Sequence, residues 1–173
     1  MTAKRERTNP LDKPHLKRFN ELLVELKKES PRGEVMVSAT VLDEQLAECI
    51  KSRLIDDPDV AKLLDGFNAP FGSFATRIVG AFALGCISDR ERRELDTIRR
   101  IRNEFAHGLP VNFDDPGIKD RCALLTYAAS DYANVVVPAR SRFGTAVVAL
   151  VLNLANRPFY VAQRRLSYEA WAY

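Results

Sequence analysis

The stretch LDTIRRIRNEFAHG, residues 95–108, constrains the fold of this chain most strongly. Its apolar side chains recur at three- and four-residue intervals and therefore share one side of a helix. They are Leu95, Ile98, Ile101 and Phe105. Ser88, with Glu91 three residues later, forms a capping box that predicts the start of this helix. Gly108 stands where a residue of left-handed backbone commonly ends one. The sequence thus predicts an amphipathic helix from 88 to 108.

Arg102 lies at the edge of the apolar side of this helix, four residues after Ile98. A guanidinium in such a place needs a charged partner or a wet cavity, because burying it alone is costly. Asp43 lies at the border of the apolar side of another expected helix, which makes it the first candidate partner. We therefore predict a buried Arg102–Asp43 pair. Arg99, Asn103 and His107 repeat every four residues and form a polar seam beside it.

The rest of the chain predicts one all-α domain, a single multi-helix bundle of six to eight helices. Besides 88–108, the expected helices span 14–29, 32–55, 59–64, 74–84, 118–132 and 140–156. No repeat or second domain is visible, and no confident strand. We expect a basic flexible tail over residues 1–12, the bundle over 13–157, and an aromatic segment over 158–173 that docks on the body or on a neighbouring subunit.

Two apolar features predict further packing. Phe67, Phe71 and Phe74 lie in or beside a loop rich in turn formers, and we expect them to anchor it on the core. The helix 140–156 is apolar nearly all round, so it should be central in the bundle or part of a subunit interface. A homodimer is the expected outcome, because large apolar patches are rare on soluble monomers.

Composition excludes several classes of protein. A formal charge of +3 over 173 residues permits nucleic-acid contact without arguing for it. The three cysteines are odd in number and each lies among apolar residues, which is typical of buried thiols in a reducing compartment. With two histidines, no metal-ligand spacing is present, and no cofactor motif is found. The longest uncharged run, 143–156, is too short to span a bilayer. These features predict a cytoplasmic protein without a membrane segment.

Residues 74–101 are the part of the sequence that bears on whether the protein contacts DNA directly. It has a helix, a turn at Gly85 and a second helix rich in arginine, which resembles a helix-turn-helix. The arginines are weak nucleic-acid candidates: Arg90, Arg92, Arg93, Arg99 and Arg100. The pattern then breaks, because Glu91 and Glu94 stand where the second helix should turn apolar side chains inward. A solvated basic face is the better interpretation.

The motif RNEFAH, from Arg102 to His107, leaves two interpretations open. An arginine that holds a phosphate and a histidine that moves a proton are what a metal-independent ribonuclease needs, with Asn103 beside them. Five residues of helix turn through about 500°, so the two side chains point roughly 140° apart. They converge only at a helix end or by pooling from two subunits. In the structural alternative Arg102 pairs with an internal acid and His107 favours the negative end of the helix dipole.

Parts of the sequence resemble two known groups of proteins. RNEFAH matches the arginine-x4-6-histidine motif of the HEPN helical superfamily, including the polar residue after the arginine. Longer pieces resemble the mannitol operon repressor (MltR-type) family. They are RGEVMVSATVLDEQL, LLDGFNAPFGSFATRI, FALGCIS, IRRIRNEFAHG and FDDPGIKDRC. The resemblance implies an oligomeric helical bundle with a role in bacterial regulation of sugar-alcohol uptake, and no conventional DNA-binding motif.

The leading hypothesis is a non-enzymatic, cytoplasmic transcription regulator without a cofactor, which resembles the mannitol operon repressor and acts through protein–protein contacts. The alternative is a HEPN-type endoribonuclease or toxin that uses Arg102, Asn103 and His107. The third is a regulator that touches DNA or RNA directly through its arginines.

Overall fold

A computed structural model describes residues 21–26, 28–108 and 110–172. Over these residues seven α-helices and one 3-10 turn follow one another, and one isolated antiparallel bridge, Tyr132 to Val135, is present. The elements are α2 (Pro31–Arg53), η2 (Pro58–Val60), α3 (Ala61–Leu64), α4 (Phe74–Ala83), α5 (Asp89–His107), α6 (Pro116–Ala123), α7 (Ala139–Ala155) and α8 (Arg157–Ala162). The predicted all-α class is confirmed. Residues 21–26 are helical too, while residues 14–20 and 27 of the helix expected over 14–29 lie outside the described residues.

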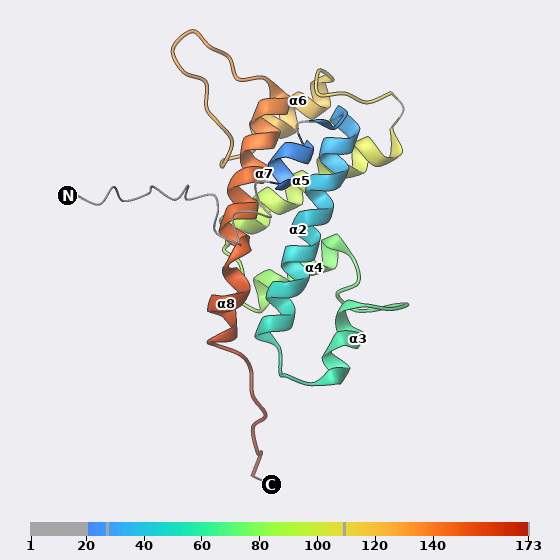
Figure 1. Ribbon diagram of the computed structural model, residues 1–173, viewed down its shortest axis with the longest axis vertical. Helices are drawn as coiled ribbons and strands as arrows, with labels where there is room; N and C mark the ends of the chain where they lie inside the picture. Colours follow the sequence, from blue (N-terminus) through green and yellow to red (C-terminus); the bar gives the residue numbers. More distant parts are fainter. Residues whose placement is uncertain (1–20, 27, 109, 173) are drawn as a thin grey trace, which may run out of the picture.

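Helix α2 is the centre of the arrangement. It packs against α4, α5, α7 and α8, and Figure 1 shows it running alongside the long α7–α8 pair, with α3 on its other side. One side of α2 is fully buried, and its core residues are Val35, Leu42, Leu46, Cys49 and Ile50. The predicted apolar side of α5 meets it, with Leu95, Ile98, Ile101 and Phe105 all fully buried. This packing brings the polar seam of α5 beside α2.

Short hydroxyl side chains set the beginnings of the helices. Ser30 Oγ accepts from Gly33 N at 3.0 Å and Pro31 follows as the first residue of α2. Ser73 and Thr76 form a reciprocal capping box at α4. The capping box predicted for α5, between Ser88 and Glu91, is confirmed. Local sequence therefore decides where these helices start.

The prediction of a left-handed glycine at position 108 is wrong. Gly108 ends α5 in an extended conformation, with φ −83° and ψ 142°. A side chain there would collide with Val111, so the glycine serves close approach of the chain. The left-handed glycine is Gly85, at φ 69°, between α4 and α5. There Cys86 N donates to Ala81 O at 2.8 Å and closes the end of α4.

Helix α7 packs inside the bundle, which is one of the two expected positions for this apolar helix. It packs on α2, α5, α6 and α8, and its inward residues are Phe143, Ala146, Val147, Leu150, Val151 and Leu154. Leu152 is nevertheless exposed. The continuous stretch Ala139–Ala162 is long and apolar enough to cross a membrane by length and composition, with a mean hydropathy of 1.3. Six core residues come from α7, while 33% of the apolar window is buried inside the fold. Length and composition alone therefore do not assign this helix to a membrane.

Two local expectations are corrected. The helix expected over 118–132 ends at Ala123, because Thr126 N and Tyr127 N donate to the Glu94 carboxylate instead of to helical carbonyls. Phe67 is 98% exposed and does not anchor its loop, whereas Phe71 and Phe74 are half-buried against the core. The three cysteines are free and buried as expected, and burial raises the pKa of the Cys49 thiol to about 12.

The segment after α7 differs in part from the expectation of a docked aromatic tail. Its first residues form helix α8, and Leu166 N donates to Arg53 O at 2.8 Å. The Tyr168 hydroxyl donates to Asp57 Oδ2 at 3.0 Å. The aromatic rings themselves stay exposed, namely Phe159, Tyr160, Tyr168 and Trp171. The segment is thus attached to the body through the buried Val161 of α8 and through polar contacts beyond it, and docking of its rings on a neighbouring subunit stays a prediction.

Candidate functional site

A cavity of about 350 Å³ lies where α2, the start of α4 and the second half of α5 meet. Its lining combines charged, polar and small side chains from these three elements. They are Ala39, Thr40, Asp43, Gly72, Ser73, Phe74, Ala75, Arg99, Arg102 and Asn103. Three residues of the polar seam and motif singled out in the sequence therefore meet here. The cavity is the candidate functional site.

Arg77 holds one wall of this cavity in place. Its side chain is 12% exposed, and its Nη1 donates to Asp43 Oδ2 at 2.9 Å. Its Nε donates to Phe71 O at 2.8 Å and its Nη2 to Leu64 O at 3.0 Å. One guanidinium thus ties α4 to α2 and to both ends of the loop between α3 and α4. This contact is structural, and it fixes the position of Asp43.

The predicted Arg102–Asp43 pair is wrong, because Arg77 occupies the place of the arginine. Arg102 Nη1 instead donates to Asn103 Oδ1 at 3.1 Å, and its side chain is partly exposed to the cavity. Among the described residues no carboxylate lies within ion-pair distance of Arg102. The guanidinium of Arg102 lies at the edge of the core and faces a cavity, which is the expected alternative to a charged partner.

Asp43 is only half satisfied by its neighbours. Oδ2 accepts from Arg77, while the buried Oδ1 has no hydrogen-bond partner in the described part of the chain. Burial raises the pKa of this carboxyl above its ordinary value, although the charges of Arg77 and Arg102 act in the opposite direction. Counting only the residues that the structure describes, the cavity therefore contains an acid with one oxygen that accepts no hydrogen bond and an arginine that pairs with no acid.

The five arginines considered for nucleic-acid contact are mostly paired on their own helix. Arg92 and Arg93 both bind Asp89, and Arg99 and Arg100 both bind Asp96. Arg90 donates from Nε to Thr126 Oγ1 and from Nη2 to Thr126 O, both at 2.8 Å. Only Arg99 of this group reaches the cavity. This side of α5 is thus largely neutralised by its own acids.

His107 lies apart from the other residues of its motif. It is exposed in the last turn of α5, while Arg102 and Asn103 line the cavity. Within one chain the fold therefore does not bring Arg102 and His107 to one cavity, as their angular separation on the helix indicated. No group of three or more histidines, cysteines or acids that could hold a metal is present in the described ranges.

Sequence reasoning missed the buried charges that build this region. Glu91 and Glu94 are 4% and 2% exposed, so these positions do turn inward, with polar partners in place of apolar packing. Glu91 pairs with Arg157 at 2.7 Å, and Glu94 accepts from backbone amides. Arg77 also had a detectable pattern, since it lies three residues after Phe74 and one before the buried Ile78. A helical wheel places it at the edge of the buried side.

Comparison with known proteins shows which solved structure has a similar overall fold. Neither a family model nor a curated protein matches the chain. A solved structure does: the X-ray structure of the MtlR–HPr complex from Escherichia coli contains a chain with 22% sequence identity and a TM-score of 0.58. The match covers 83% of this chain and 97% of that one. The HEPN resemblance gains no support from it. At this identity the likeness shows the fold alone, and the fold of this chain is MtlR-like.

Proposed function

We propose that this protein is a bacterial transcription regulator that acts by binding another protein, as a relative of the mannitol operon repressor. The observation that carries the proposal is the shared fold over 97% of the MtlR chain, which was solved in complex with a protein, HPr. The sequence pieces that resemble the mannitol operon repressor family point in the same direction. In this proposal the protein is cytoplasmic and carries no conventional DNA-binding motif.

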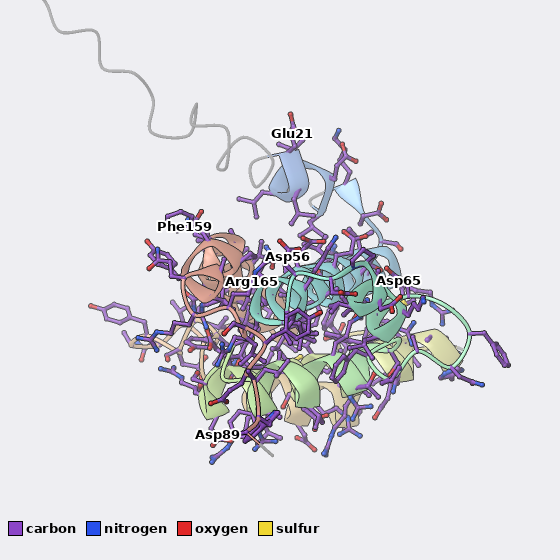
Figure 2. The ribbon with its side chains drawn as sticks, turned by 90° about the horizontal axis from the view of Figure 1, so that it is seen from below. Glu21, Asp56, Asp65, Asp89, Phe159 and Arg165 are labelled. Carbon is purple, nitrogen blue, oxygen red and sulfur yellow. The ribbon has the colours of Figure 1, made fainter. Side chains whose placement is uncertain are left out.

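Exposed apolar side chains supply surfaces for such a partner. On α4, Val79 and Phe82 face outward. On α8, Phe159 and Tyr160 are exposed, and their rings meet edge to face with centroids 5.5 Å apart. Figure 2 shows Phe159 at the outer side of the bundle. Exposed aromatic residues of this kind are common anchors in protein interfaces.

The proposal is tested by titrating purified HPr into the full-length protein in a calorimeter. We expect saturable binding. Two double variants locate the surface: Val79→Ser with Phe82→Ser on α4, and Phe159→Ser with Tyr160→Ser on α8. Because all four side chains are exposed, neither variant should change the unfolding midpoint. A flat titration with wild-type protein would count against HPr as the partner.

Self-association belongs to the same proposal. Leu152 of α7 and the rings of α8 remain uncovered within one chain, so a second copy is the expected cover. Light scattering at micromolar concentration measures the mass. A mass near 19.5 kDa would contradict a dimer.

The second candidate is the metal-independent endoribonuclease. It is favoured by one observation, the cavity shared by Arg102 and Asn103, in which Arg102 has no acid partner among the described residues. This candidate needs His107 from a second subunit. Incubation of the protein with a mixed RNA pool without metal, beside an Arg102→Ala, His107→Ala double variant, tests it. Cleavage by the parent but not by the variant would replace the regulator proposal.

A further inference from the structure

We propose that the cavity between α2, α4 and α5 binds a small organic anion that carries hydroxyl groups, such as a phosphorylated or carboxylated sugar. The cavity has the size for it. About 350 Å³ equals roughly a dozen water molecules at ~30 Å³ each and falls in the range of small-molecule sites. The inference does not depend on the protein partner proposed above.

The positive charge of the lining selects an anion. Arg102 has no carboxylate partner within the described ranges and donates one hydrogen bond, to its neighbour Asn103. Arg99 uses Nε and Nη2 on Asp96 Oδ1 at 3.0 and 2.7 Å, so its Nη1 lies outside this pair. A guanidinium offers five N–H donors in a planar fork that matches carboxylate and phosphate oxygens.

The start of α4 adds to this charge at the same cavity. Ser73, Phe74 and Ala75 line it, and the first turn of α4 contains no acidic residue. The Ser73 hydroxyl accepts from Thr76 N at 3.2 Å, while the amides of Phe74 and Ala75 occupy helix positions that have no intrahelical acceptor. The positive end of the helix dipole thus acts together with two arginines.

Asp43 is the reason to expect hydroxyl groups on the ligand. It lines the cavity, and its carboxylate can accept hydrogen bonds beyond the one that Arg77 donates to Oδ2. A ligand hydroxyl supplies such a donor, whereas sulfate has none. Asn103 carries an amide group that can donate as well, since its Oδ1 already accepts from Arg102. One anionic group and several hydroxyls therefore complete the lining.

Calorimetric titration of the full-length protein, without HPr, tests the site with four probes. Glucose 6-phosphate and gluconate combine an anion with hydroxyls, glucose has hydroxyls alone, and sulfate has the anion alone. We expect saturable one-to-one binding of at least one of the two hydroxylated anions with a Kd below about 1 mM. We expect glucose and sulfate to bind at least tenfold more weakly.

Variants assign the binding to this cavity. Arg102→Gln should weaken it at least tenfold, because a charged bidentate contact is lost. Asn103→Asp should do the same by placing a carboxylate beside Arg102. Arg100→Gln is the matched control: it removes an equal charge from the same helix at an exposed position outside the lining. Thermal unfolding verifies that each variant is folded.

Three results would overturn the site. They are no saturation with either hydroxylated anion, equal binding by Arg102→Gln and wild type, and equal affinity for glucose or sulfate and the hydroxylated anions. A difference between glucose 6-phosphate and gluconate identifies the acid group that the site prefers.

Discussion

Two carboxylates, Glu91 of α5 and Asp43 of α2, lie near opposite ends of α5 and differ in how completely they are hydrogen-bonded. Glu91, at the start of the helix, accepts from Arg157 on both oxygens, at 2.7 and 3.2 Å, and from Ser88 N at 2.8 Å. Asp43, facing the second half of the helix, has one bonded and one unbonded oxygen. Burial alone raises the pKa of either carboxyl, but the bonds and the charge of Arg157 lower the pKa of Glu91 overall. The pKa of Asp43 stays raised.

The difference separates a region built for stability from one left open for binding. Both regions place an arginine at the edge of the same core. At the first end the guanidinium and the acid complete each other, and Arg157 Nη1 also donates to Cys86 O at 2.8 Å. At the second end Arg102 and Asp43 line one cavity without bonding each other.

Arg157→Ala should lower the free energy of unfolding by about 3–5 kcal/mol, because it leaves the buried Glu91 charge without its main partner. Urea unfolding at neutral pH measures the change. Arg164→Ala, an exposed arginine just beyond α8, is the control and should stay within about 0.5 kcal/mol of wild type. A loss of similar size in both variants would show that the pair is not what stabilises this end.

Lowering the pH should change the contributions of Glu91 and Asp43 to the free energy of unfolding in opposite directions. Both changes should be smaller than the loss caused by Arg157→Ala. Glu91 has a folded-state pKa below its ordinary 4.5, so its contribution is lost as the pH falls from about 4.5 through the folded value. Asp43 has a folded-state pKa above 3.8, so the folded state loses stability as the pH rises through the raised value.

Urea unfolding of wild type, Glu91→Gln and Asp43→Asn between about pH 3 and pH 7 measures both effects. The stability advantage of wild type over Glu91→Gln should shrink as the pH falls. The difference between wild type and Asp43→Asn should move in wild type's favour over the same range. Parallel curves for all three proteins would refute the contrast.

Gly80→Ala should destabilise the wall of the cavity by about 1–2 kcal/mol net. A Cβ at Gly80 would lie 2.6 Å from Cε1 of Phe71, and such overpacking costs about 1–3 kcal/mol. The usual helix gain of up to about 1 kcal/mol from glycine to alanine offsets part of this. Gly117→Ala in α6 has nothing within 4 Å and should therefore stabilise. Thermal unfolding compares the two, and a stabilised Gly80→Ala would contradict the close contact.

Arg102→Ala should change the free energy of unfolding by no more than about 0.5 kcal/mol, because no ion pair is broken within the described residues. Urea unfolding of Arg102→Ala and Arg157→Ala under the same conditions compares the stability contributions of the two arginines directly. A loss above about 2 kcal/mol would mean that Arg102 stabilises the fold, as a buried pair does.

Local patterns allowed most helices to be predicted from the sequence. α4 and α7 begin and end within one residue of the expected 74–84 and 140–156, and α2 within two residues of 32–55. Apolar spacing and capping hydroxyls act over three or four residues, so a single sequence contains them. The end of α6 was missed, because it depends on Glu94, 32 residues away from Thr126.

The candidate site was predicted in part for the same reason. The periodicity of α5 placed Arg102 at the edge of the core, and this position is correct. Which arginine meets Asp43 depends on how α4 lies against α2, and Arg77 is 34 residues from Asp43. Spacing along one helix contains no information on that choice. The cavity is a product of tertiary packing and could not be derived from the seam alone.

The position of α2 has a consequence for the order in which the protein forms during synthesis. Its contacts with α7 join distant parts of the chain: Gln45 Nε2 donates to Val151 O across 106 residues. The Tyr168 hydroxyl reaches Asp57 across 111 residues. A growing chain therefore leaves the part of α2 that α7 and α8 cover exposed on the ribosome until these two helices have been made. Folding waits for this late closure and is slow for a helical protein, since long loops must close first. A chain stopped before residue 139 would aggregate as an incomplete bundle, not survive as a smaller domain.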